Sequence, residues 1–253
     1  MATAPVEGYD PELFAQIAVL EDASFWFAER NRLILWALRR YAAEPKAYLE
    51  VGCGTGYVLA AVRSAFPATR CVGVEPFEAA LEIARRRVAD SELRRGDAAG
   101  LEEESAFDVV GSFDVLEHIA DDARALEAMA RALRPGGVLV VTVPQHRWLW
   151  SDADERGGHV RRYRRDELIE RVHAANLEMI RCTSFVTTLL PVLSANRWLR
   201  RQRPPSDPLS ELRMAPWMQS ALRPALALDR LAIRAGLNLP AGGSLLLVAR
   251  RRP

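Results

Sequence analysis

The sequence predicts a doubly wound, Rossmann-like α/β domain, with a mostly parallel sheet and helices on both faces. Three observations support this prediction. Short aliphatic and β-branched runs alternate with segments of helical periodicity, which is typical of repeated βαβ units. The strand candidates are apolar almost throughout, as in strands buried on both faces. A length of 253 residues suits one large domain better than two.

Each expected element follows from its residue pattern. Strand candidates lie at 47–52, 71–75, 107–113 and 136–144, with a weaker one near Leu93. Helical periodicity covers 57–65, 77–89 and 121–133, and an amphipathic helix is expected at 24–41. "RPGG" at 134–137 should end the helix before it, since proline cannot continue a helix and glycine accepts a positive φ. A helix at 166–177 with Asp166 as N-cap, a strand at 177–185 and a strand at 243–250 complete the order.

Composition restricts the partners and the compartment. The 34 Lys and Arg against 33 Asp and Glu give a net charge of +1, so no global field attracts nucleic acid. Cys53, Cys71 and Cys182 show no metal-binding or disulfide spacing, which favours a reducing, cytoplasmic location. The first residues lack the basic and apolar regions of a signal peptide. The apolar run at 185–193 is too short to span a bilayer, so no transmembrane helix is predicted.

The stretch "LEVGCGTGY" places three glycines, Gly52, Gly54 and Gly56, directly after a strand and before a helix. Open α/β sheets bind ligands at this place. A dinucleotide fingerprint would need a further glycine where Tyr57 stands, so NAD is disfavoured. The spacing suits S-adenosylmethionine better, because this cofactor carries a sulfonium and an amino-acid tail in place of a pyrophosphate. Glu75 at the end of the second strand would accept its ribose hydroxyls, and Asp97 its adenine amino group.

The motifs together resemble a known family. "LEVGCGTGYVL", "GVEP", "RGDA", "FDVVGSFDVLEHI" and "ALRPGGVLVVTVP" follow one another over residues 47–144, and they are similar to class I S-adenosylmethionine-dependent methyltransferases. More narrowly, they resemble the type 11, ubiquinone/menaquinone-biosynthesis-like branch. The resemblance implies a seven-stranded sheet whose closing strand, 243–250, runs antiparallel between its neighbours.

The resemblance also implies a set of cofactor-binding residues. Those around the methionine tail are Glu50, Gly52, Gly54 and Gly56; Glu75 binds the ribose, and Asp97 with Ala98 the adenine. Cys53 and Pro76 belong to the same set, and Phe113 is expected near the methyl donor. Trp26 and Arg30 are expected to cover the cofactor from the N-terminal helix, although a helix that packs its aromatic side chains on the sheet explains them as well.

Methyl transfer is an in-line displacement, so a base is needed only where the acceptor atom carries a proton. His118, His159 and Tyr163 are the catalytic candidates, with His118 after the fourth strand the most direct general base. An equally simple interpretation is that Asp114, Glu117 and His118 shape the loop and cap the next helix. "DVLEH" resembles the E-x-x-E-H metal motif of some methyltransferases. Because no fourth ligand is evident, we expect no metal.

The stretch "GGHVRRYRRDEL" at 157–168 concentrates four arginines on the expected acceptor side. Pairing with Asp152, Asp154, Glu155 and Asp166 is the expectation for most of them, while one or two would bind an anionic group of the acceptor. The segment 187–240 reads as a helical insertion that packs on the core, roofs an apolar substrate or makes a peripheral membrane contact.

These inferences give one domain in five parts. They are an N-terminal helical cap at 1–45, a cofactor-binding core at 46–144, an acceptor-side segment at 145–186, the insertion at 187–240 and a closing strand at 241–253. The expected activity is O-methylation of a small-molecule or of a lipid- or glycan-linked acceptor. The alternative is a non-catalytic module that binds the cofactor or a partner protein. A nucleic-acid substrate is disfavoured, because no Asn/Asp-Pro-Pro-aromatic motif follows the fourth strand. The sequence does not indicate an oligomeric state.

Overall fold

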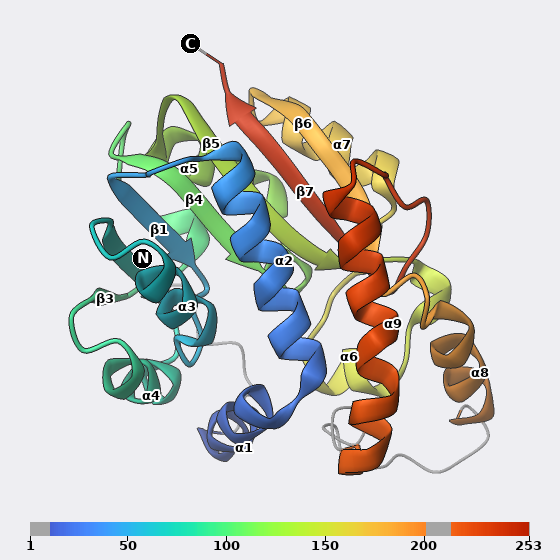
Figure 1. Ribbon diagram of the computed structural model, residues 1–253. Helices are drawn as coiled ribbons and strands as arrows, with labels where there is room; N and C mark the ends of the chain where they lie inside the picture. Colours follow the sequence, from blue (N-terminus) through green and yellow to red (C-terminus); the bar gives the residue numbers. More distant parts are fainter. Residues whose placement is uncertain (1–10, 201–213, 253) are drawn as a thin grey trace.

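The computed structural model describes residues 11–200 and 214–252 and shows one seven-stranded sheet in the order β3-β2-β1-β4-β5-β7-β6 (Figure 1). The strands are β1 (Ala47–Val51), β2 (Arg70–Glu75), β3 (Glu92–Arg95), β4 (Phe107–Phe113), β5 (Leu133–Pro144), β6 (Leu177–Phe185) and β7 (Ser244–Arg251). β1 to β5 pair in parallel, whereas β7 lies antiparallel between β5 and β6. The predicted fold class is confirmed, including the reversed closing strand.

Helices cover both faces of this sheet. They are α1 (Pro11–Ala23), α2 (Phe25–Tyr41), α3 (Tyr57–Ala65), α4 (Glu78–Arg87), α5 (Asp122–Ala132), α6 (Asp152–Arg156), α7 (Arg165–Ala174), α8 (Leu190–Arg200) and α9 (Pro216–Arg234), with short 3₁₀ turns η1 (Ala98–Gly100), η2 (Leu116–His118) and η3 (Arg147–Leu149). In α2 the side chain of Ser24 caps the first turn by accepting a hydrogen bond from the Trp26 amide.

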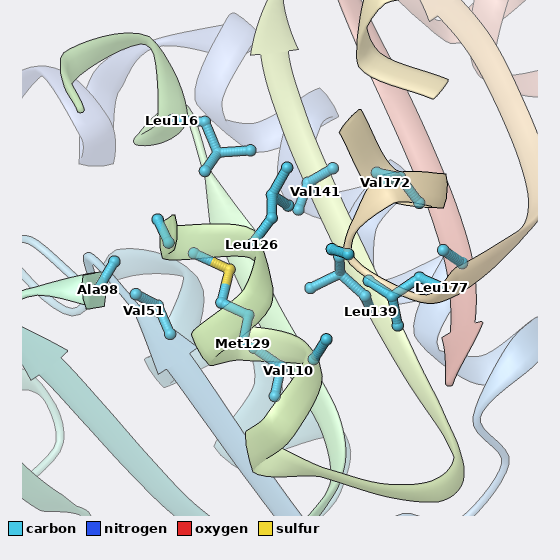
Figure 2. Packing of buried hydrophobic residues seen from close by; sticks show 14 of the residues in the cluster. Val51, Ala98, Val110, Leu116, Leu126, Met129, Leu139, Val141, Val172 and Leu177 are labelled. Atoms are coloured by element: carbon cyan, nitrogen blue, oxygen red, sulfur yellow. The ribbon is translucent and has the colours of Figure 1, made fainter. Parts of the chain in front are cut away.

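Two hydrophobic clusters correspond to the two faces of the sheet. Successive strand residues point to opposite faces, so Leu49 of β1 joins the cluster under α5 and α7 and its neighbour Tyr48 joins the cluster under α2, α3 and α9. Figure 2 shows Leu126 and Met129 of α5 against Val110 of β4, all without exposed surface. Strands covered on both sides in this way leave only their ends for function.

Two expected boundaries were wrong. β5 begins at Leu133, three residues earlier than predicted, because the chain through "RPGG" already runs along β4 with an irregular register. The left-handed glycine that this turn requires is Gly136, with φ +78°. α7 begins at Arg165 with Arg164 as N-cap, so Asp166 lies inside the first turn and pairs with Arg164 at 2.8 Å. In the first turn, the carboxylate of Asp166 still interacts favourably with the positive N-terminal end of the helix dipole.

The insertion between β6 and β7 is helical, as expected, in the part that the structure describes. α9 packs beside α2 in front of the sheet, where Arg230 pairs with Glu29 at 2.9 Å (Figure 1). Asp229 fixes the chain before α8 by accepting the amide hydrogens of Thr187 and Thr188. Residues 1–10 of the expected cap and 201–213 of the insertion lie outside the described residues. Within 11–200 and 214–252, no helix has the length and apolarity to cross a membrane.

Candidate cofactor and acceptor site

The glycine turn after β1 has positive φ angles that residues other than glycine rarely adopt. Gly52 has φ +71°, and a Cβ there would lie 2.4 Å from Cγ2 of Val115. Gly54 has φ +51° and, unlike Gly52, has nothing within 4 Å of the place of a Cβ. Both angles favour glycine, but only at Gly54 is there open space above the backbone. The turn therefore presents a bare backbone to whatever lies over the end of β1.

Glu75 closes β2 beside this turn. Its carboxylate is buried and accepts hydrogen bonds from the amides of Gly54 at 2.9 Å and Phe77 at 3.1 Å. Burial raises the pKa of Glu75 to about 7, although these two amides act in the opposite direction. The next residue, Pro76, is exposed, and its carbonyl accepts a hydrogen bond from Arg95. The acid is thus placed at the strand end as predicted, and its charge responds to pH near neutrality.

Glu50 of β1 is buried behind the turn. It accepts a hydrogen bond of 2.7 Å from the Tyr48 hydroxyl, and burial raises its pKa to about 8. Its carboxylate also feels the positive charge of Arg30. Cys53, in the turn itself, is 5% exposed, and burial raises the pKa of its thiol. Neither side chain is exposed to bulk solvent, so a cofactor would contact Glu50 or Cys53 only if it lay against the turn beneath the covering helices.

The remaining expected cofactor residues lie at the ends of β3 and β4. Asp97 begins η1 and accepts a hydrogen bond of 2.7 Å from the Gly100 amide, while Ala98 is buried in the core. Phe113 ends β4, and its ring packs in the cluster under α2. Asp97 thus stands at the same sheet edge as Gly54 and Glu75. Phe113 supports the sheet face next to that edge.

The N-terminal helices cover the turn. Glu21 of α1 accepts hydrogen bonds from the Thr55 hydroxyl and from Arg87, and Thr55 is only 2% exposed. In α2, Arg30 pairs with Asp114 and lies over the Trp26 ring, 4.8 Å from its centroid. The expected cover is therefore a pair of helices: α1 is joined to the turn by the hydrogen bond from Thr55 and to α4 by the ion pair with Arg87, and α2 is joined to the end of β4 by the ion pair with Asp114.

These residues fit S-adenosylmethionine on two observations of the structure. Open space lies directly over the Gly54 backbone, where a ligand can approach without meeting a side chain. Carboxylates at the ends of neighbouring strands, Glu75 and Asp97, are the groups that accept ribose hydroxyls and an amino group. Glu75, already held by two amides, would need little rearrangement to bind a ribose.

Beyond β4, two histidines from distant segments come together. The rings of His118 in η2 and His159 in the loop after α6 meet edge to face with centroids 4.6 Å apart. Burial, together with the neighbouring His159, lowers the pKa of His118 to about 4. Glu117, buried beside them, has a pKa raised well above its ordinary value by burial and by Asp114. A pair of imidazoles and a buried acid thus lie on the expected acceptor side.

Tyr163, the third catalytic candidate, lies elsewhere. Its side chain is fully buried in the cluster under α5 and α7, and its hydroxyl donates to Asp122 at 2.6 Å. Burial and the Asp122 carboxylate raise the pKa of the phenol. A side chain without exposed surface does not reach an acceptor, so we propose a structural role for Tyr163 in place of the catalytic one.

The four arginines around Tyr163 hold the segment in place. Arg162 pairs with Asp154 at 2.7 Å and Arg164 with Asp166, as expected, but Arg161 pairs with Asp122 at 2.6 Å. Arg165 donates to three groups, namely the carbonyls of Cys182 and Leu239 and the hydroxyl of Ser184. These arginines bind the segment to the start of α5, to α6 and to β6.

Asp154 is a structural residue whose full role the sequence did not indicate. It is 1% exposed and accepts hydrogen bonds from His159 at 2.8 Å, from Arg162 and from the Ser151 amide. Interactions with His159 and Arg162 hold its pKa well below the ordinary value. The Ser151-x-x-Asp154 spacing of a capping box was the available signal, but it indicates only the local contact.

Sequence comparisons match this chain to known proteins. The family described as "Methyltransferase domain" matches residues 21–181. A probable S-adenosylmethionine-dependent methyltransferase of Mycolicibacterium smegmatis is 32% identical over 164 residues, 63% of this chain and 62% of that protein. Trans-aconitate 2-methyltransferase of Methylobacterium radiotolerans is 34% identical over 119 residues, 47% of this chain and 46% of that enzyme. The matched segment thus spans less than two thirds of either relative.

The fold has a counterpart among solved structures. The structure of a methyltransferase in complex with the Trm112 methyltransferase activator of Haloferax volcanii aligns with a TM-score of 0.66. At 19% sequence identity, the alignment covers 98% of this chain and 100% of that chain.

Proposed function

This chain belongs to the S-adenosylmethionine-dependent class I methyltransferases, and we propose that it methylates an oxygen atom of a small-molecule or lipid-linked acceptor. S-adenosylmethionine is its cofactor, and when bound it supplies the electrophilic methyl group. The protein's own task is to hold the acceptor oxygen in line with the methyl and sulfur and to exclude water. Gly54, Glu75 and Asp97 would hold the cofactor at the carboxyl ends of β1 to β3.

The observation that carries the oxygen assignment is the group formed by Glu117, His118 and His159. A hydroxyl acceptor must lose its proton as the methyl arrives, and these side chains lie after β4, the region where we expect the acceptor to approach. The low pKa of His118 keeps its imidazole uncharged at neutral pH, and it also makes His118 a weaker base than an ordinary histidine. An uncharged imidazole does not repel the positive sulfonium, so this group suits the side of the site that receives the methyl.

The described surface favours a lipid-linked acceptor over a freely diffusing one. The exposed face of α9 carries Trp217, Ala221, Pro224, Leu228 and Leu231, spaced by three or four residues, and α8 exposes Val192, Trp198 and Leu199. Arg223 and Arg234 flank the α9 face, and the only acid of α9, Asp229, is buried. An apolar helix face with basic flanks is typical of peripheral binding to anionic lipid.

The remaining parts of the proposal follow from charge and thiol chemistry. We do not propose nucleic acid as the methyl acceptor, because the net charge is +1 and the arginines of 157–168 are bound to protein groups. Three buried, unpaired cysteines favour a reducing compartment, so we place the activity in the cytoplasm.

The test is methyl transfer itself. The protein is incubated with S-adenosylmethionine carrying a labelled methyl group and with fractionated extract of the source organism, and each fraction is analysed by mass spectrometry. We expect a labelled product in the lipid fraction that is heavier by one CH₂ unit and whose fragmentation in the mass spectrometer places the labelled methyl on an oxygen atom. A His118→Asn variant should lose most of this product, while His173→Asn, an exposed histidine of α7, should retain it. Calorimetric binding of S-adenosylmethionine without any labelled product would contradict the proposal and favour the non-catalytic alternative.

A further inference from the structure

Glu117 differs from the other buried carboxylates of the described residues. Its side chain is 1% exposed, and neither of its oxygens has a hydrogen-bond partner. The other buried acids all accept at least one hydrogen bond: Glu21, Glu29, Glu50, Glu75, Asp122, Asp154 and Asp229. Burial of an unpaired carboxylate costs several kcal/mol, so such a group needs a proton or a cation. Glu117 is therefore the described acid whose partner is missing.

Two imidazoles stand where that partner would be bound. Glu117, His118 and His159 each offer one ligand atom, and these atoms lie within 4.8 Å of one another. Tetrahedral zinc with bonds of about 2.1 Å needs ligand atoms roughly 3.4 Å apart. The ligand atoms would have to approach one another by up to about 1.4 Å, which a modest rotation of the partly exposed histidines allows.

The groups behind the histidines are those found behind metal ligands. Nδ1 of His159 lies 2.8 Å from Oδ1 of Asp154, whose carboxylate accepts that proton and so leaves Nε2 as the ligand atom. His118 is hydrogen bonded to the backbone of Gly158 in the same loop. A carboxylate or a carbonyl behind a ligating histidine fixes its tautomer and its ring orientation.

We propose that Glu117, His118 and His159 bind one divalent transition-metal ion of the zinc type. Two imidazoles and one carboxylate are a ligand set of catalytic zinc sites, which keep a fourth position open. Asp114 is not part of this set. It pairs with Arg30 and accepts a hydrogen bond from Thr142 at 3.2 Å, so the residue that the sequence motif would have used is occupied. His159, 41 positions after His118, takes its place.

A consequence for catalysis rests on the proposed function. An acceptor hydroxyl in the open position would have its pKa lowered by the cation, and its proton would pass to water when the methyl is transferred. The metal site itself does not depend on this step, so it can be tested without any acceptor.

The experiment uses the full chain freed of metal by dialysis against a chelator. Co²⁺ is titrated as a spectroscopic substitute for zinc, and visible absorption and equilibrium dialysis report the binding. We expect one equivalent to bind with intense tetrahedral bands, and Zn²⁺ to displace it. His159→Ala and Glu117→Gln should each weaken the affinity at least tenfold, while Asp114→Asn and the exposed His173→Ala retain it.

Two outcomes would overturn the proposal. One is the absence of stoichiometric Co²⁺ binding by the wild-type chain. The other is binding that His159→Ala leaves unchanged. If Glu117→Gln does not fold, as judged by circular dichroism, the decision passes to His159→Ala, whose side chain is 19% exposed in the wild type. Calorimetry with S-adenosylmethionine on the same metal-free sample tests the proposed function separately.

Discussion

The cofactor side and the acceptor side of this molecule are held together by different means. At the ends of β1 and β2 the shape comes from backbone, through the left-handed glycines of one short turn and the amides that bind Glu75. After β5 the shape comes from buried side-chain ion pairs, centred on Asp154 and Asp122, that join residues far apart in sequence. The first side depends on backbone conformation. The second depends on buried ion pairs, and removing one partner of such a pair lowers the free energy of unfolding more.

The largest expected effect is on the charged side. Asp154→Ala should lower the free energy of unfolding by about 3–5 kcal/mol, because it leaves Arg162 buried without its carboxylate. Denaturant titration measures the loss, with Asp152→Ala, an exposed neighbour in α6, as the control that should change by less than about 0.5 kcal/mol. Equal effects at the two positions would mean that the buried network does not hold this side together.

Next in size is the backbone side. Gly52→Ala should cost about 2–4 kcal/mol, because the left-handed backbone strains alanine and its Cβ meets Val115. Gly54→Ala should cost only about 1–2 kcal/mol, since it adds strain without a contact. Calorimetry with S-adenosylmethionine should distinguish the two variants further, because Gly54→Ala should lose affinity for the cofactor although it still folds. An equal cost in unfolding at both positions would contradict the packing difference.

A smaller effect is expected at Tyr163. Tyr163→Phe removes the hydroxyl that donates to Asp122 and should lower the free energy of unfolding by about 1–2 kcal/mol. Methyl transfer measured at a temperature where the variant is folded should stay within a few-fold of wild type. A loss of product as large as that of His118→Asn would restore Tyr163 as a catalytic residue.

The last effect depends on pH: it is expected at Glu50, is smallest in acid and grows as pH rises. The folded-state pKa is about 8 against an ordinary value of 4.5, so the folded chain holds a proton that the unfolded chain releases. This contribution to stability is fully present below about pH 4.5 and is lost as pH rises through about 8. Glu50→Gln should therefore match wild type at pH 5 and exceed it in unfolding free energy at pH 9. A constant difference across that range would contradict the raised pKa.

The two sides also differ in what the sequence could predict. The order of strands, the glycine turn and the placement of Glu75 follow from local patterns, since the period of apolar residues and the spacing of glycines are read within one segment. The pairing of Arg161 with Asp122 does not, because several acids lie within reach of any arginine until the fold selects one. The proximity of His118 and His159 likewise depends on how the loop after α6 returns to η2.

Calorimetry with S-adenosylmethionine on Glu75→Gln tests most directly the claim that the ends of β1 and β2 hold the cofactor. Glutamine keeps the shape of the side chain but not the charge that accepts the ribose hydroxyls. The matched control is Glu78→Gln on the exposed start of α4. We expect the affinity of Glu75→Gln to be at least tenfold weaker, with folding retained, and the affinity of Glu78→Gln to be unchanged. Unchanged affinity at Glu75 would contradict this placement of the cofactor.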